Sequence, residues 1–345
     1  MKTGSKLTYC ATSPENREKG DGSYDSHQNG NGSKEEFVKS STVNSTKETD
    51  QNKILNFPAK KKFNMITNHE NLDVLINDKD STVRVAIAEQ GYGLDRLVDD
   101  KDWNVRRAVA KQGFGLDKLI NDESWAVRIA VVKRDYGLDK LVNDKNSYVR
   151  RAVAERGYGF DKLINDRDYR VRLVVARQGY GLDKLVDDED ITIRVIVAEQ
   201  GYGLDKLVND EDPDVRTAVA GQGYGLDKLI NDEYPCVRAA VAGQGYSLDK
   251  LIDDDNWIVR KAVAKQGYGL DRLINDEDPY VRGAVAGQGY GLNILINDKD
   301  PYVRAAVAEQ NYGLSKLVND DNWIVHKTAS KQARKLSMNE VEKKG

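Results

Sequence analysis

The stretch DPDVRTAVAGQGYGLDKLIND at residues 212–232 is one unit of a repeat that decides the fold. Its arginine, Arg216, belongs to a series that recurs every 22 residues from Arg84 to Arg304, and His326 takes the next slot. Twelve units without an insertion or a deletion are incompatible with a globular domain whose loops vary in length. Self-similarity at a fixed period is typical of a solenoid, in which each unit packs on its neighbours.

The first half of the unit has the signals of a helix. Asp212 is a good N-cap residue, and Pro213 suits the first helical position, where no N–H is needed. Val215, Ala218 and Val219 then fall at i, i+3 and i+4, on one helical face. The spacing predicts an amphipathic helix of about ten residues in every unit.

The second half of the unit has the signals of a turn and a shorter helix. Gly223 can take the left-handed conformation of a C′ residue, and Tyr224 can close a Schellman turn against the last helical turn. Gly225 serves as a second N-cap, and Leu226–Asn231 is short enough to be partly 3₁₀. The sequence therefore predicts an all-α solenoid of about twelve 22-residue repeats, each with one α-helix and a short α or 3₁₀ turn.

The pattern D-x-x-VR-x-AVA-x-x-G-Y-G-LD-x-L-I/V-N-D resembles the leucine-rich repeat variant family and, more broadly, HEAT repeats. The resemblance covers residues 68–332 and depends on repetition rather than on a single motif. It implies alternating α and 3₁₀ helices in a right-handed superhelix. Two departures are clear: the units are about two residues shorter than the usual repeat of the family, and its cysteine-rich iron–sulfur segment is absent.

The composition changes along the chain and indicates four segments. Residues 1–53 are polar, with few large apolar side chains, and we expect a disordered tail. Residues 54–67 are expected to cap the first repeat, although their LysLysLys run at 60–62 leaves open a basic peptide that binds a partner. Residues 68–336 form the repeat array and residues 337–345 a C-terminal tail.

The charge distribution limits the class of partner. The chain has a net charge of −3, residues 1–62 and 331–345 each carry +3, and the remainder carries −9. An acidic array argues against a general phosphate-binding surface. Cys10 and Cys236 show no metal-ligand spacing, and no apolar run reaches the ~18 residues of a membrane span. We expect a cytoplasmic monomer with no membrane contact.

The repeated Asp and Arg side chains are predicted to be structural. An aspartate and an arginine recur together in the units. An Asp–Arg network between successive turns therefore explains the arginines better than a phosphate-binding site does. The aromatic slot represented by Tyr224 is likewise attributed to turn closure rather than to base stacking. The structural ladder is represented by Asp78, Arg84, Asp188, Arg194, Asp298 and Arg304.

Function is expected where the repeats differ. One stripe of the longer helix varies between repeats. It consists of the residue before the repeated valine, the residue after the repeated arginine, and the residue four positions further on. It is basic and bulky early and rich in glycine later, although a glycine in a helix costs ~1 kcal/mol relative to alanine. Such glycines indicate close approach by a partner. The predicted partner-binding residues are Arg107, Lys111, Lys133, Tyr148, Arg151, Arg170, Arg177, Gly221, Gly243 and Gly287.

These observations predict a non-enzymatic scaffold that binds a protein or peptide, and the basic part of the stripe favours an acidic segment. The first alternative is a HEAT-like protein that binds nucleic acid through the basic patch of repeats two to five. The second is a HEAT-like enzyme, although no catalytic triad, metal-ligand set or cofactor motif is visible. Neither a catalytic residue nor a cofactor is predicted.

Overall fold

The computed structural model describes residues 51–342, and no strand occurs in that range. The predicted all-α solenoid of repeats is confirmed, because helices pack in sequence order along the chain. The described residues form two compact units, and the boundary between them in the sequence lies between Tyr180 and Gly181. The expected tail at residues 1–53 lies outside the described residues except for residues 51–53, which are helical.

Residues 51–180 alternate longer and four-residue helices. The longer helices are α2 (Ala59–Thr67), α4 (Ser81–Glu89), α6 (Trp103–Gln112), α8 (Trp125–Val132), α10 (Ser147–Glu155) and α12 (Tyr169–Arg177). The short helices are α3 (Leu72–Leu75), α5 (Leu94–Leu97), α7 (Leu116–Leu119), α9 (Leu138–Leu141) and α11 (Phe160–Leu163).

Residues 181–342 continue the same alternation without a change of period. The longer helices are α14 (Ile191–Glu199), α16 (Pro213–Gly221), α18 (Pro235–Gly243), α20 (Trp257–Lys265), α22 (Pro279–Gly287), α24 (Pro301–Glu309) and α26 (Trp323–Glu342). The short helices are α13 (Leu182–Leu185), α15 (Leu204–Leu207), α17 (Leu226–Leu229), α19 (Leu248–Leu251), α21 (Leu270–Leu273), α23 (Leu292–Leu295) and α25 (Leu314–Leu317).

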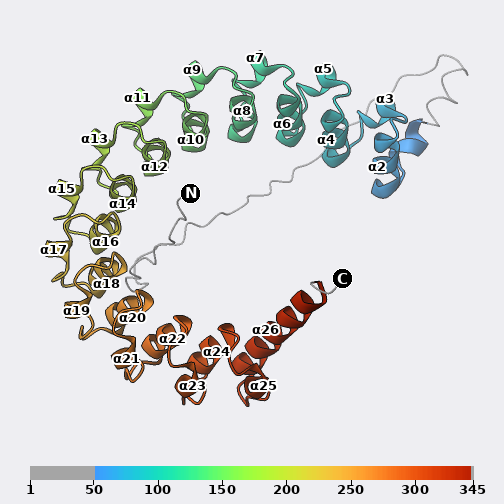
Figure 1. The fold of residues 1–345 in the computed structure, drawn as a ribbon. Coiled ribbons are helices and arrows are strands. Elements are labelled where there is room, and N and C mark those ends of the chain that lie inside the picture. The colour runs from blue at the N-terminus through green and yellow to red at the C-terminus, as the bar shows by residue number, and fades with distance from the viewer. Residues whose placement is uncertain (1–50, 343–345) are drawn as a thin grey trace, which may run out of the picture. The chain divides into compact units, whose positions relative to one another are not determined.

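Within each unit, every longer helix packs against the longer helix of the next repeat. The short helices lie along the opposite edge of the row, as Figure 1 shows. The core runs between the two rows: Val105 and Val109 of α6 are fully buried, and Leu97 of α5 is 3% exposed. Burial of these apolar side chains is the main stabilising term, and it is repeated in each unit.

The longer helices begin where their capping residues predict. In α16, the Asp212 carboxylate accepts the N–H of Asp214 at 2.8 Å. Ser124 holds the predicted N-cap position of α8 but makes no side-chain cap bond. Tyr234, the exception seen in the sequence, makes none either. The same cap bond is made by Asp80, Asp102, Asn146, Asp168, Asp190, Asn256, Asp278, Asp300 and Asn322.

Most of the longer helices end in the predicted Schellman turn. After α4, Tyr92 N–H donates to the Ile87 carbonyl at 3.3 Å, and Gly91 N–H donates to the Ala88 carbonyl at 2.9 Å. These are the two bonds of the motif, with Gly91 in the left-handed region at φ +75°. The aromatic slot therefore closes a turn, as its position indicated.

Two features favour glycine at its second position in the repeat. Gly93, which precedes α5, has φ +59°, and a Cβ placed on it would lie 2.1 Å from the Ile76 Cδ1 atom. Both the backbone conformation and the close contact disfavour a larger residue, although Asn71 and Ser247 occupy this slot in two repeats. The helix that follows is a single turn, Leu94–Leu97, shorter than the two turns expected.

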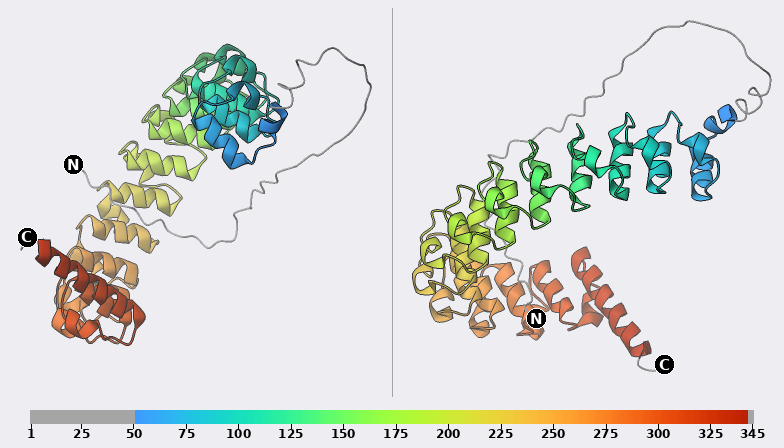
Figure 2. Two further views of the ribbon diagram at one scale, coloured as in Figure 1. Left: turned by 90° about the vertical axis from the view of Figure 1, so that its right-hand side faces the viewer. Right: turned by 90° about the horizontal axis from the view of Figure 1, so that it is seen from above.

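The C-terminal boundary differs from the expectation. The expected tail begins at residue 337, but α26 continues without a break from Trp323 to Glu342. Figure 2 shows this extended helix, in red, at the end of the row of residues 181–342. No glycine interrupts it after His326, whereas the longer helices of inner repeats end near a left-handed residue, so the helix continues.

Candidate partner-binding surface

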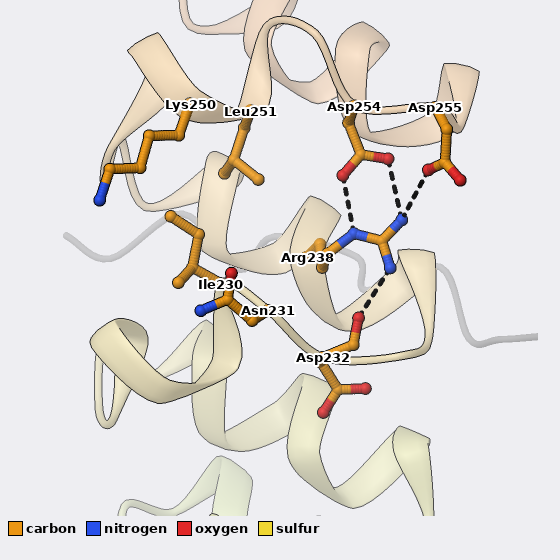
Figure 3. A pocket seen from close by; sticks show the side chains of 8 residues that line it. All are labelled: Ile230, Asn231, Asp232, Arg238, Lys250, Leu251, Asp254 and Asp255. Atoms are coloured by element: carbon orange, nitrogen blue, oxygen red, sulfur yellow. Dashed lines mark hydrogen bonds and ion pairs between the residues drawn. The ribbon is translucent and has the colours of Figure 1, made fainter.

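The repeated arginine connects two successive units. Figure 3 shows Arg238, whose Nε and Nη2 donate to both carboxylate oxygens of Asp254 at 2.7 and 2.9 Å. Its Nη1 donates to the backbone carbonyl of Asp232 at 2.7 Å. The Asp254 carboxylate also accepts the N–H of Asn256, the cap of the next helix, at 2.9 Å. One ion pair therefore fixes the turn of its own repeat and the start of the next longer helix.

The predicted ladder residues take these positions, with one refinement. Arg194 binds the carboxylate of Asp210 at 2.8 Å and the backbone carbonyl of Asp188 at 2.9 Å. The aspartate six residues earlier thus contributes its carbonyl, and the aspartate sixteen residues later contributes its carboxylate. Arg84 and Arg304 repeat the pattern with the carbonyls of Asp78 and Asp298.

The ladder has little capacity to bind a ligand. The recesses along it are lined by residues that already bond to one another, such as Asp232, Arg238 and Asp254. A hydrogen bond from Arg304 holds the pKa of Asp320 below its usual value despite partial burial. Hydrogen bonding to the charged form has this sign, and it indicates a satisfied structural pair.

The predicted basic stripe divides into paired and unpaired cations. Arg151 pairs with Glu155 at 3.0 Å on the same helix, and Arg170 pairs with Asp168 at 3.0 Å. The other three exposed cations make no ion pair with any residue from 51 to 342; they are Lys111, Lys133 and Arg177. These three have charge available for a partner.

Exposed aromatic rings lie close to two other cations of the predicted stripe, Arg107 and Arg170. The Trp125 and Tyr148 rings stack across successive repeats with centroids 5.3 Å apart and planes inclined by 29°. The Arg170 guanidinium lies 5.5 Å from the Tyr148 centroid, and that of Arg107 lies 5.0 Å from the Trp103 centroid. Trp125 and Tyr148 nevertheless remain 46% and 44% exposed, so the stack keeps free surface. We call Trp125, Tyr148 and Arg170 the first aromatic cluster.

Sequence reasoning included Tyr148 and Arg170 but missed the tryptophans. All four tryptophans of the chain, Trp103, Trp125, Trp257 and Trp323, stand at the first residue of a longer helix. The signal was available, because their separations are all multiples of the 22-residue period. A slot that is occupied by tryptophan only in some repeats is the kind of variation in which function was expected.

The predicted glycines belong to a different compact unit from the predicted cations. Gly221, Gly243 and Gly287 each end a longer helix of residues 181–342, whereas the cations belong to residues 51–180. A Cβ added to Gly243 or Gly287 would meet no atom within 4 Å. The fold therefore does not require these two glycines, and each stands on open surface.

Other classes of site find no support in the described residues. Between residues 51 and 342, no group of three or more His, Cys, Asp and Glu side chains could hold a metal ion. None of the helices described there is both long enough and apolar enough to cross a membrane. No protein-family model and no curated protein matches the sequence.

Proposed function

We propose that this chain is a non-enzymatic, HEAT-like repeat scaffold that binds an acidic protein segment along the longer helices of residues 103–177. The observation that carries the proposal is the first aromatic cluster, in the same repeats as Lys133 and Arg177, two exposed cations without an intramolecular counter-ion. Aromatic residues and arginine are enriched at protein interfaces, where they supply the larger share of binding energy.

Charge favours an acidic protein segment over nucleic acid. The basic strip lies in an array that is otherwise acidic, so a long polyanion would be repelled outside the strip, whereas a short acidic segment fits within it. Nucleic acid thus remains the weaker alternative.

A defined probe tests this proposal. The acidic probe peptide is a labelled decapeptide in which glutamate and tryptophan alternate, and its neutral counterpart has glutamine in place of glutamate. We expect the full chain to bind the acidic probe peptide more tightly than the neutral one. Lys111→Glu, Lys133→Glu and Arg177→Glu together should weaken binding by about tenfold or more, because interface charges of the wrong sign repel the peptide.

The matched control reverses the same number of charges on the opposite edge of the same unit. Lys118→Glu, Lys140→Glu and Lys162→Glu lie on the exposed short helices α7, α9 and α11. This variant should bind the acidic probe peptide to within about threefold of the parent chain, because screening weakens charges on a remote edge. If both triple variants lost the same affinity for the acidic probe peptide, the effect would be due to net charge and not to a local site. Binding of single-stranded nucleic acid, but of neither peptide, would favour the alternative.

A further inference from the structure

The unit of residues 181–342 carries a second arrangement like the first aromatic cluster. Trp257 and Tyr280 follow Trp125 and Tyr148 by 132 residues, which is six periods of 22, so they occupy the same slots. Their rings stack with centroids 5.1 Å apart and planes inclined by 28°, nearly the geometry of the first pair. The other two close ring pairs in residues 51–342, Phe160–Tyr180 and Tyr280–Tyr302, are tilted rather than stacked.

A cation again accompanies the rings, but from a different position. Lys261 of α20 places Nζ 5.4 Å from the Trp257 centroid and 5.2 Å from the Tyr280 centroid. It makes no ion pair with any described residue. Partial burial lowers the pKa of Lys261, nearby Lys265 lowers it further, and Asp278 opposes the shift. This ammonium group is thus partly desolvated without a bonded carboxylate, and an external carboxylate would compensate its charge. We call Trp257, Lys261 and Tyr280 the second aromatic cluster.

The surface beside the second cluster is more open than that beside the first. The slots of Arg151 and Glu155, which pair with each other on α10, are occupied on α22 by Gly283 and Gly287. A Cβ at either glycine would meet nothing within 4 Å. Tyr302 adds a further ring 6.1 Å from Tyr280 and is 53% exposed. A bulky side chain of a partner has room here next to exposed rings and a cation.

We propose that the second aromatic cluster is a second docking site for the same class of partner, an acidic protein segment with aromatic or large aliphatic side chains, so that one chain binds two such segments. This inference rests on the proposed function. The aromatic face provides apolar contact, Lys261 and Lys265 provide charge complementarity, and the two glycines provide space. Trp103 with Arg107 and Trp323 with Lys327 form tryptophan–cation contacts, but no ring of the next repeat stacks on either tryptophan. We therefore do not propose docking sites at these two contacts.

Calorimetric titration of the full chain with the acidic probe peptide tests the number of sites. We expect two peptides bound per chain. Gly283→Glu should remove one binding event, because it fills the open space and places a carboxylate beside the second cluster. Folding should not suffer, since the position is open and glycine is a poorer helix former than glutamate. Gly283→Gln is the control of equal size, and it should weaken the second event less.

The outcomes separate this inference from the proposed function. The variant Lys111→Glu, Lys133→Glu, Arg177→Glu should lose the other event and keep the one that Gly283→Glu removes. One peptide per parent chain, with no effect of Gly283→Glu or of Lys261→Glu, would overturn the second site and leave the first intact. The second site would also be overturned if the triple variant lost both binding events and Gly283→Glu lost neither. Absence of any binding to the parent chain would refute the proposed function itself.

Discussion

Lys62 Nζ lies 2.6 Å from the Asp78 carboxylate, in the position that an arginine takes in the repeats from Arg84 to Arg304. Lys62 precedes Arg84 by 22 residues, so it is the first member of the ladder. His69 and Asn71, at φ +59° and +54°, occupy the slots of the two glycines. Residues 54–67 are therefore part of a degenerate repeat rather than a simple apolar cap, and Lys62 is structural.

Lys62→Met should destabilise the N-terminal end of the array. Asp78 is 1% exposed, and removal of its partner leaves a buried carboxylate without a counter-ion, which costs about 3–5 kcal/mol. Denaturant unfolding measures the loss, and hydrogen exchange should locate it in α2 to α4. Lys62→Arg should retain the parent stability, and Lys60→Met, on an exposed side chain, serves as the control. Equal stability of the two methionine variants would disprove the role of Lys62.

Arg194→Ala should be strongly destabilising in the middle of the array. Its guanidinium joins the Asp210 carboxylate to the Asp188 carbonyl, and the residue is only 8% exposed. We expect a loss of about 3 kcal/mol in the free energy of unfolding. Arg194→Lys should recover only part of it, since lysine cannot make the bidentate contact. Arg177→Ala, at an exposed position, should change stability by less than about 0.5 kcal/mol. A weakened partner affinity with unchanged stability in Arg194→Ala would contradict the structural assignment.

The features that local chemistry determines could be predicted from the sequence. The Asp212 cap and the Gly91 stop depend on bonds within a few residues, so their spacing specifies them. Contacts between repeats are harder to predict. Arg194 reaches sixteen residues forward to Asp210, and Trp125 reaches Tyr148, because neighbouring helices lie side by side only after the array has formed. The sequence shows which slots vary, but not which side chains already pair within the chain.

The stability of residues 51–180 should fall in acid partly through Asp168. Burial raises the pKa of this carboxyl, but bonds from the Arg170 guanidinium, the Ser147 hydroxyl and the Arg170 N–H outweigh it and lower the pKa from 3.8 to about 2. A depressed folded-state pKa stabilises the fold above the unfolded value and ceases to do so as pH falls through the folded value. Unfolding measured between about pH 5 and about pH 2 should show this loss, and it should be smaller in Asp168→Asn, which keeps a capping side chain. Asp161→Asn, which changes an exposed side chain on α11, serves as the control.

Ser247 and Gly269 occupy the same slot in successive repeats. Exchanging serine and glycine at these two positions should change the melting temperature in opposite directions. Ser247 has φ +47°, a conformation that costs a residue with a Cβ roughly 1–2 kcal/mol. Ser247→Gly should therefore raise the melting temperature. Gly269→Ser should lower it, because it places a Cβ at φ +59° and the Ile252 Cδ1 atom, 2.2 Å from that Cβ, would have to move. Stability changes of the same sign in both variants would show that the slot does not require glycine.

Gly243→Ala and Gly287→Ala should separate folding from binding. Both glycines end longer helices, and an added Cβ would meet no atom within 4 Å. Alanine is the better helix former, so each change should stabilise the chain by up to ~1 kcal/mol. If a partner approaches the backbone beside the second aromatic cluster, Gly287→Ala should nevertheless weaken the second binding event of the acidic probe peptide several-fold. Gly243→Ala, on α18 outside that cluster, should affect it less. A Gly287→Ala chain that is more stable and still binds two acidic probe peptides with parent affinity would show that Gly287 is needed neither for folding nor for this partner. The second binding event would then depend on the Trp257 and Tyr280 rings and Lys261 alone.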